Sequence, residues 1–250
     1  MIKLDISSYN SIKHYIKKTP YGTVYPMSIA EQKQYGDVYT EDDSVLLWHC
    51  GGFAFIYGQC SDKFLEQIHK DFLIADNLSK RFMLFTADPN TEQFFRKKDG
   101  LVFASRFHYE YPSEISIQLR KLPSEYRICE INRELFTSIE GRVTPDFYWK
   151  DSEEFLKHGK GYCMMIENTP VSWAFSAASS NEGIDIGIET APNYRQKGLG
   201  AHVAEQMIRY CFENNKHPIW SCDTANTSSQ ILAEKLGFIK VSSYTTIKKQ

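Results

Sequence analysis

The most informative stretch of this chain is Thr190–Ala201, which reads TAPNYRQKGLGA. It follows Ile184–Thr190, where apolar and polar residues alternate as in a strand, and it leads into Leu199–Asn214, where apolar residues recur at helical spacing. We therefore expect a loop that joins a strand to the N-terminus of a long helix. The first N–H groups of a helix lack partners within it, and the helix dipole is positive at that end, so such a loop is suited to bind an anion.

The residue types within the loop strengthen this expectation. Gly198 and Gly200 allow the backbone to approach a phosphate closely and to adopt φ angles that other residues avoid. Arg195 and Lys197 add positive charge, so a diphosphate is the ligand that suits the loop best. The alternative is an ordinary helix that begins with glycines and basic residues.

In this context the stretch resembles the diphosphate-binding signature of the GNAT acetyltransferase superfamily, (Gln/Arg)-x-x-Gly-x-(Gly/Ala), with Arg195, Gly198 and Gly200 at its three positions. Residues Asn226–Phe238, which begin with Asn and end in Gly-Phe, are similar to a later segment of the same family. The resemblance covers about the last half of the chain. It implies an α/β (α+β) fold with a mixed, mostly antiparallel central sheet flanked by helices. It also implies an N-acyltransferase that uses acetyl-CoA as co-substrate and no metal.

The resemblance further implies which residues hold the cofactor. In the family two strands separate, here Ile184–Thr190 and Ile219–Cys222, and the pantetheine arm pairs with the first of them as an added strand would. Cofactor contacts are expected from Ile188, Glu189, Thr190, Arg195, Gln196, Lys197, Gly198, Leu199, Gly200, Ala201, Asn226 and Ser229. For Asn226, a role as a turn or helix cap is an open alternative.

The proton donor is not where the family pattern places it. Many GNAT enzymes have a tyrosine four residues before the Gly of Gly-Phe, and it protonates the leaving thiolate, but Ala233 occupies this position. The substitutes that the sequence offers are solvent and the hydroxyl groups of Tyr194, Tyr210, Tyr244 and Ser229.

The general base is also open. An amine with a pKa of about 10 must lose a proton before it can attack, so a carboxylate or a water chain is needed. Glu189 and Asp185 lie on one face of the strand beside the cofactor and are the candidate bases, with Glu182 and Asp223 as further acids nearby. The alternative for each is a solvated acid on an exposed face.

The acceptor is expected to be a primary amine of a small molecule that attacks directly in a ternary complex. Glu140, Tyr148 and Trp149 are weak acceptor-site candidates, because they lie where GNAT folds usually shape acceptor specificity. A mobile surface loop is the alternative for each. The second function that we consider is a non-catalytic acyl-CoA-binding sensor or scaffold, which Ala233 favours.

The first half of the chain contains a second pattern of the same kind. Arg81–Phe103 and Ile219–Phe238 both run from a strand through an acidic turn and an Asn to a short helix, a Gly and a strand. This similarity suggests a degenerate GNAT-like α/β half over 1–122, followed by the catalytic domain over 123–250. The junction Tyr57–Ser61 has no basic glycine loop, so the first half is expected to bind no CoA. The alternative is a chance recurrence of a common strand–turn–helix–strand arrangement.

Composition limits the class of protein. The 250 residues carry a net charge of -2, and 42% of them are hydrophobic, so the chain can bury a core and nothing indicates a nucleic-acid or membrane partner. Six cysteines form no CxxC pair, which argues against a zinc site and for buried, reduced thiols. No signal pattern and no apolar run of about 20 residues is present, which favours a cytoplasmic protein. Exposed sheet edges are compatible with a homodimer.

Overall fold

The computed structural model describes residues 1–17, 22–114, 117–119 and 121–250. These residues form two compact units. The first unit consists of Met1–His108, Cys222–Ala225 and Ser242–Gln250, and the second of Tyr109–Ser221 and Asn226–Val241. Strands β6 (Leu101–Glu110), β11 (His217–Asp223) and β12 (Ile239–Lys249) each contribute residues to both units.

The first unit is built around a mixed sheet. Its elements in chain order are β1 (Ile2–Lys3), a 3-10 helix (Ile6–Ile12), α1 (Lys13–Ile16), α2 (Val24–Ala30), β2 (Gly36–Glu41), β3 (Ser44–His49), β4 (Phe53–Gly58), α3 (Asp62–Ile68) with a π-helical extension (His69–Leu73), β5 (Met83–Thr86), α4 (Pro89–Arg96) and β6 (Leu101–Glu110). The strands lie in the order β1-β2-β3-β4-β5-β12-β6. Strands β1 to β4 pair antiparallel, β4 and β5 pair parallel, and β12 (Ile239–Lys249) pairs antiparallel with β5.

Both faces of this sheet are covered, which explains why every residue of β3 is buried. Leu46 and Trp48 belong to the core cluster that includes Phe64 of α3, whereas Val45 and Leu47 belong to a second cluster with residues of the N-terminal helices. Successive side chains of a strand point to opposite faces, so the helices of the two clusters pack on opposite sides of β3.

The second unit has a sheet of the same kind. Its elements are β7 (Tyr126–Glu130), α5 (Arg133–Ser138), α6 (Pro145–Tyr148), α7 (Ser152–His158), β8 (Gly161–Ile166), β9 (Thr169–Ser179), β10 (Gly183–Thr190), α8 (Leu199–Glu213), β11 (His217–Asp223) and α9 (Thr227–Leu236). The strands lie in the order β11-β10-β9-β8-β7, with antiparallel pairs from β7 to β10 and a parallel pair between β10 and β11.

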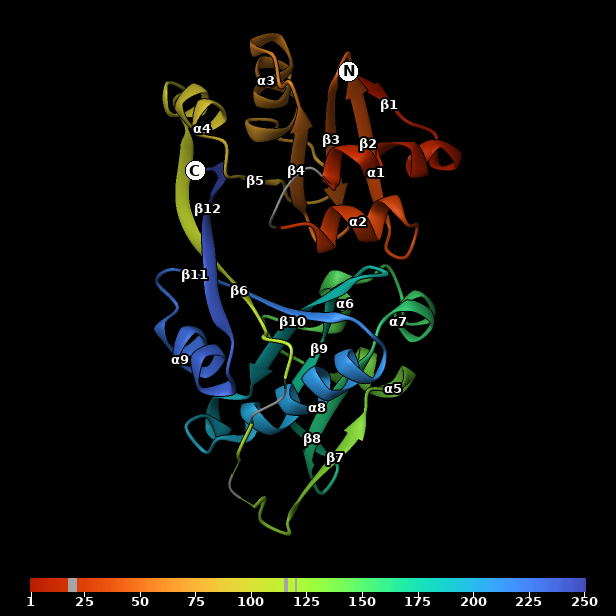
Figure 1. The fold of residues 1–250 in the computed structure, drawn as a ribbon, viewed down its shortest axis with the longest axis vertical. Coiled ribbons are helices and arrows are strands. Elements are labelled where there is room, and N and C mark those ends of the chain that lie inside the picture. Colours follow the sequence, from red (N-terminus) through yellow and green to blue (C-terminus); the bar gives the residue numbers. More distant parts are fainter. Residues whose placement is uncertain (18–21, 115–116, 120) are drawn as a thin grey trace. The chain divides into compact units, whose positions relative to one another are not determined.

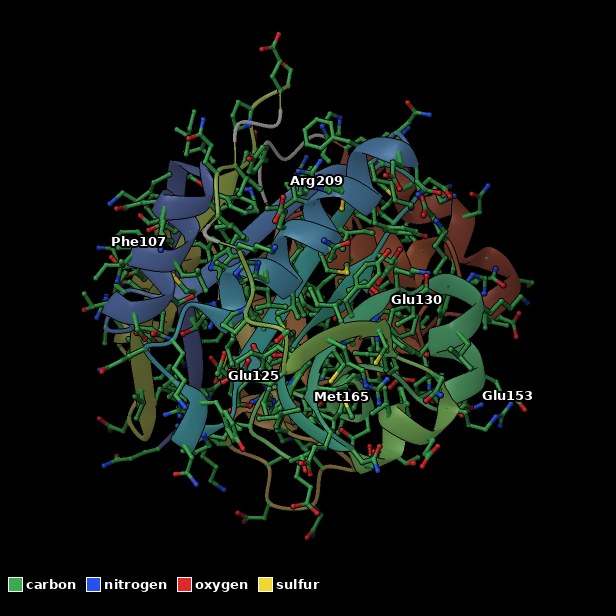
Figure 2. All side chains as sticks on the ribbon, turned by 90° about the horizontal axis from the view of Figure 1, so that it is seen from below. Phe107, Glu125, Glu130, Glu153, Met165 and Arg209 are labelled. Carbon is green, nitrogen blue, oxygen red and sulfur yellow. The ribbon has the colours of Figure 1, made fainter. Side chains whose placement is uncertain are left out.

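Helix α8 covers one face of this second sheet. It packs against β8, β9 and β10, and its apolar stripe includes the fully buried Val203 and Met207 (Figure 1). The opposite stripe is polar, and Arg209, labelled in Figure 2, pairs there with Glu205 one turn earlier at 2.6 Å between Nη2 and Oε1. The predicted fold class, a mostly antiparallel mixed sheet flanked by helices, is confirmed.

Several details differ from the sequence predictions. The first five residues of β10 are all buried, Asp185 included, so both faces of the strand are covered at this end, and α8 packs on one of them. The turn residues around Pro112 and Pro123 predict a strand between them at 115–119. This range lies partly outside the described residues, and the described residues 117–119 are not part of a strand. The sequence also predicts a last strand over Phe238–Tyr244, whereas the observed strand runs from Ile239 to Lys249.

Two stretches of the chain repeat one order of elements. In the earlier stretch β4, α3, β5, α4 and β6 follow one another, and in the later stretch β10, α8, β11, α9 and β12 do so. In each case the first and second strands of the series form a parallel pair. This is the order that the repeat hypothesis expects. The division of the chain into halves at residues 122 and 123 stays a prediction. The two compact units of the structure are not continuous in sequence, because Ser242–Gln250 belongs to the first unit.

Candidate functional site

The site begins at the junction between β10 and α8. Gly198 is the N-cap of α8 with φ of 80°, a left-handed conformation that favours glycine, and Gln196 before it has φ of 63°. No side chain caps the helix, and no acidic residue lies in its first turn. Ala201 N donates to Gly198 O at 3.1 Å, and the N–H groups of Leu199 and Gly200 before it are left for another acceptor. A loop with this geometry can hold a phosphate group.

The strands beside this loop separate as the resemblance implies. Residues Gly183–Asp185 of β10 pair with His217–Ile219 of β11, and the pairing ends there. On its other side β10 is paired with β9 through to Thr190. The edge of β10 after Asp185 is thus available to an extended ligand, and the first turn of α8 lies close to its end, because a Cβ on Gly200 would be 3.2 Å from Thr190 Oγ1.

The basic residues of the loop hold different positions. Arg195 Nε donates to Thr190 O at 3.0 Å, and its Nη2 lies 3.5 Å from Glu189 Oε1, so this side chain turns back toward the end of β10. Lys197 Nζ lies 5.0 Å from the centre of the Tyr194 ring. The carbonyl of Thr190, which was expected to meet the pantetheine, therefore already accepts a bond from Arg195.

Glu189 joins this loop to a distant segment of the second unit. Its Oε2 accepts hydrogen bonds from Arg142 N at 2.7 Å and Val143 N at 2.8 Å, and Trp173 Nε1 donates to Val143 O at 2.7 Å. We call these contacts, together with the Arg195 ion pair, the Glu189 clamp. An oxygen that already accepts two N–H groups is poorly placed to remove a proton from a substrate, so the geometry favours a positioning role over that of a base.

The second candidate base, Asp185, is buried and not solvated. Its residue is 8% exposed, and Ser221 Oγ donates to its Oδ2 at 3.1 Å. Four residues separate it from Glu189, which is roughly 13 Å along a strand. The two carboxylates therefore do not act as a pair on one proton.

The side chains of Asn226 and Ser229 at the start of α9 form hydrogen bonds within the protein. Asn226 is the N-cap, and its Oδ1 accepts from Ser229 N at 3.1 Å, which is the capping role that the sequence left open. Ser229 Oγ accepts from Trp220 Nε1 at 3.0 Å. Contacts of Asn226 and Ser229 with a cofactor stay predictions.

The structure distinguishes the substitutes for the missing tyrosine. Ala233 is fully buried. Tyr244 belongs to the first unit, and Tyr210 lies twelve residues into α8 from Gly198, roughly 18 Å along the axis. Tyr194 is half-buried beside Lys197 and lies within the loop itself. Tyr194 and solvent are therefore better placed than Tyr210.

The acceptor candidates occupy three environments. Trp149 is 2% exposed and donates from Nε1 to Ser176 O at 2.7 Å, so it is a core residue. Tyr148 is half-buried with its ring 5.7 Å from that of Phe175, and Glu140 is exposed just before the segment held by the Glu189 clamp. No local pattern in the sequence marks Trp173, or the backbone groups of Arg142 and Val143, as part of this site.

Three of the six cysteines, Cys163, Cys211 and Cys222, are buried, and the other three, Cys50, Cys60 and Cys129, are half-buried. Burial raises the pKa of Cys163 and of Cys211 to about 12, so both stay protonated at neutral pH. Within the described ranges, no group of His, Cys, Asp and Glu side chains could hold a metal ion, and no helix has the length and apolar character needed to cross a membrane.

Comparison with known proteins gives one consistent result. The family model described as GNAT acetyltransferase matches residues 15–247. The chain is 28% identical over 252 residues to an uncharacterized N-acetyltransferase, YdfB, of Bacillus subtilis, with 97% of this chain and 96% of that protein covered. The family match thus extends across residues of both units.

Two solved structures share the fold. A GCN5-related N-acetyltransferase-like protein from Streptococcus suis superposes with a TM-score of 0.75 at 24% identity, covering 98% of this chain and 100% of that one. A tandem GNAT protein from the clavulanic acid biosynthesis pathway superposes with a TM-score of 0.59 at 9% identity, covering 99% and 97%.

Proposed function

Because the chain belongs to the GNAT acetyltransferase family and is an acyltransferase, we propose that its second unit transfers an acetyl group from acetyl-CoA to the primary amine of a small molecule. The observation that carries this proposal is the left-handed loop at Gln196 and Gly198, which opens an uncapped helix beside the free edge of β10.

The cofactor fits the residues that are present. The N–H groups of Gln196–Gly200 would hold the diphosphate, where Lys197 adds a positive charge, while Ala201 N already donates to Gly198 O. The edge of β10 near Ile188 would hold the pantetheine arm, with Asn226 and Ser229 on the side of α9. Acetyl-CoA supplies the thioester that is attacked.

The reaction is direct attack in a ternary complex. The neutral amine nitrogen forms a bond to the acetyl carbon, the bond from that carbon to sulfur breaks, and the amine loses a proton. The departing thiolate is stable enough to leave without a phenol beside it, because a thiol has a pKa of about 8.5. The chain therefore needs no tyrosine at Ala233, and solvent or Tyr194 returns the proton to sulfur.

The Glu189 clamp sets the position of the acceptor in this proposal. It holds Arg142 and Val143, which follow the acceptor-site candidate Glu140, against the end of β10. Correct placement of two reactants lowers the barrier without any covalent step by the protein. Glu189 would thus act on the acceptor through the loop. Asp185 or a water chain would remove the proton of the amine.

Two variants of Gly198 test the assignment. Space around this residue is open, since a Cβ there would meet no atom within 4 Å, so a side chain does not clash with the fold. Gly198→Glu places a negative charge at the proposed diphosphate site, whereas Gly198→Asn keeps the left-handed conformation without the charge. Acetyl-CoA binding is measured by calorimetry, and thiol release is measured with a panel of primary amines.

We expect binding and amine-dependent thiol release by the wild type, retention of most binding in Gly198→Asn, and loss of binding by at least tenfold in Gly198→Glu. Equal binding in all three proteins would show that the loop does not hold the diphosphate. Binding without thiol release for any amine would overturn the proposed transfer and favour the acyl-CoA-binding alternative.

A further inference from the structure

The first unit contains a cavity of about 430 Å³ where β4 and β5 separate. These strands pair in parallel at Phe53–Phe55 and Met83–Phe85, and the cavity is lined by the residues that follow, Ile56–Gly58 and Thr86–Asp88. Every lining residue belongs to the first unit. This volume lies within the usual range for small-molecule sites, about 300–1,000 Å³.

Aromatic rings form much of the wall. Phe55 and Phe85 are stacked with ring centres 5.0 Å apart, and Tyr244 lies against Phe85 at 5.6 Å. Tyr57 also lines the cavity. Rings of this kind give the cavity an apolar wall, which is suited to the carbon skeleton of a ligand.

The described side chains that line the cavity carry negative charge and no positive charge. Among the described residues that line the cavity, Asp88 is the one whose side chain is ionised at neutral pH, and no Lys or Arg takes part. Burial raises the pKa of Asp88, but the hydrogen bonds from Thr91 and Asn90 outweigh it and hold the pKa below 3.8. The carboxylate is thus negative under all ordinary conditions.

Asp88 keeps capacity for a further donor. Its Oδ2 accepts from Thr91 N at 2.9 Å and Thr91 Oγ1 at 2.7 Å, while its Oδ1 accepts a single longer bond from Asn90 N at 3.3 Å. A carboxylate has about four acceptor positions, so Oδ1 can accept an N–H group of a ligand.

The same features argue against an anionic ligand. The helix after β4, α3, is capped by Ser61, whose Oγ accepts from Phe64 N at 3.3 Å, and Asp62 lies in its first turn. The N-terminus of α4 is already occupied by Asp88. A diphosphate would meet negative charge at both places, so the cavity disfavours such an anion.

We propose that the cavity between β4 and β5 binds a small organic ammonium ion, with its carbon skeleton against Phe55, Phe85 and Tyr244 and its N–H group on Asp88. The pairing of a ring wall with one carboxylate is complementary to such an ion in both shape and charge. The proposal concerns the first unit and does not depend on the acyl transfer proposed above.

Calorimetry on the full chain at pH 7 tests it with two probes of nearly equal shape, 2-phenylethylammonium and the neutral 2-phenylethanol. We expect the ammonium ion to bind at least tenfold more tightly than the alcohol. Asp88→Asn removes the charge and keeps a good helix cap, so the fold is retained while the affinity for the ammonium ion falls by about tenfold or more. Cys60→Leu fills part of the cavity without changing its charge and is expected to weaken both probes.

Gly198→Glu is the matched control, because it alters the loop of the second unit and leaves Asp88 and the cavity unchanged. Its affinity for 2-phenylethylammonium should equal that of the wild type. Binding that survives both Asp88→Asn and Cys60→Leu would place the amine elsewhere and overturn the proposal. Equal affinity for the two probes, or no binding of either, would overturn it as well.

Discussion

Glu189 illustrates how one side chain can be read differently in sequence and in structure. In the sequence it is an acid beside a cofactor strand, which is where a base is sought. In the structure one of its oxygens accepts two backbone N–H groups of a segment 46 and 47 residues away, and the other faces Arg195. Its role is therefore best tested by separating the binding of the amine from the chemical step.

Glu189→Gln should raise the KM for the amine by about tenfold and change kcat less, because a neutral amide oxygen accepts the two N–H groups more weakly than a carboxylate. Steady-state kinetics over a range of pH provide the measurement. A fall in kcat of a hundredfold or more, with loss of the acidic limb of the pH profile, would instead identify Glu189 as the base.

His49 is a second residue whose environment gives a quantitative expectation. Burial, with Lys80 and Arg81 nearby, lowers the pKa of His49 from 6.5 to about 3, and its Nδ1 accepts from Gly51 N at 3.0 Å. The unfolded chain binds a proton below pH 6.5 and the folded chain does not, so the stability that neutral His49 contributes is lost as the pH falls from about 6.5 toward 3.

Replacing this side chain should remove that acid sensitivity. We expect His49→Asn, which keeps an acceptor for Gly51 N, to lose about 2 kcal/mol less free energy of unfolding between pH 7.5 and pH 5 than the wild type does. Urea unfolding at several pH values measures the difference. Parallel curves for the two proteins would contradict the assignment.

At the scale of elements, α8 and α9 begin in opposite ways. Helix α8 starts at an uncapped glycine, whereas α9 starts at Asn226, whose side chain accepts from Ser229 N. A capped N-terminus has less capacity for an anion, so the difference favours α8 as the diphosphate-binding helix.

Asn226→Ala should lower the free energy of unfolding by about 1 kcal/mol, because the cap is lost, and Asn226→Asp should retain it. Denaturant unfolding gives the stability of both variants. Weaker acetyl-CoA binding in Asn226→Asp at unchanged stability would support the proposed contact of this residue with the cofactor. Equal stability of the alanine variant and the wild type would rule out an important capping role.

At the scale of the whole molecule, the end of the C-terminal strand β12 is part of the sheet and core of the first unit. The end of β12 pairs with β5, and Ile247 is fully buried in the core cluster that contains Leu84 and Phe95. Residues more than 140 positions apart in the chain therefore stabilise one core, and the first unit is incomplete without the last residues.

Ile247→Ala should reduce the free energy of unfolding by about 2–5 kcal/mol, since it leaves a cavity in a packed core. Val241→Ala is the control on the same strand, because Val241 is 49% exposed, and it should change stability by less than about 0.5 kcal/mol. Calorimetric unfolding of both variants makes the comparison, and similar losses in the two would contradict the assignment of Ile247 to that core.

Sequence patterns within short segments determined several features of this protein. The alternation in β10, the apolar stripe of α8, and the glycines between them are properties of adjacent residues, and from these the strand, the helix and the anion-binding loop could be predicted. The fold class followed from the family resemblance that these residues carry. Backbone preferences and side-chain periodicity act over a few residues, so a sequence displays them directly.

Tertiary structure alone decided the remainder. The Glu189 clamp, the burial of Asp185, the pairing of β12 with β5, and the cavity that Tyr244 helps to line all join residues that are distant in the chain. Such contacts depend on which surfaces pack together and on the register of the strands. No spacing rule within a segment encodes them, because their free energy arises only when the whole core forms.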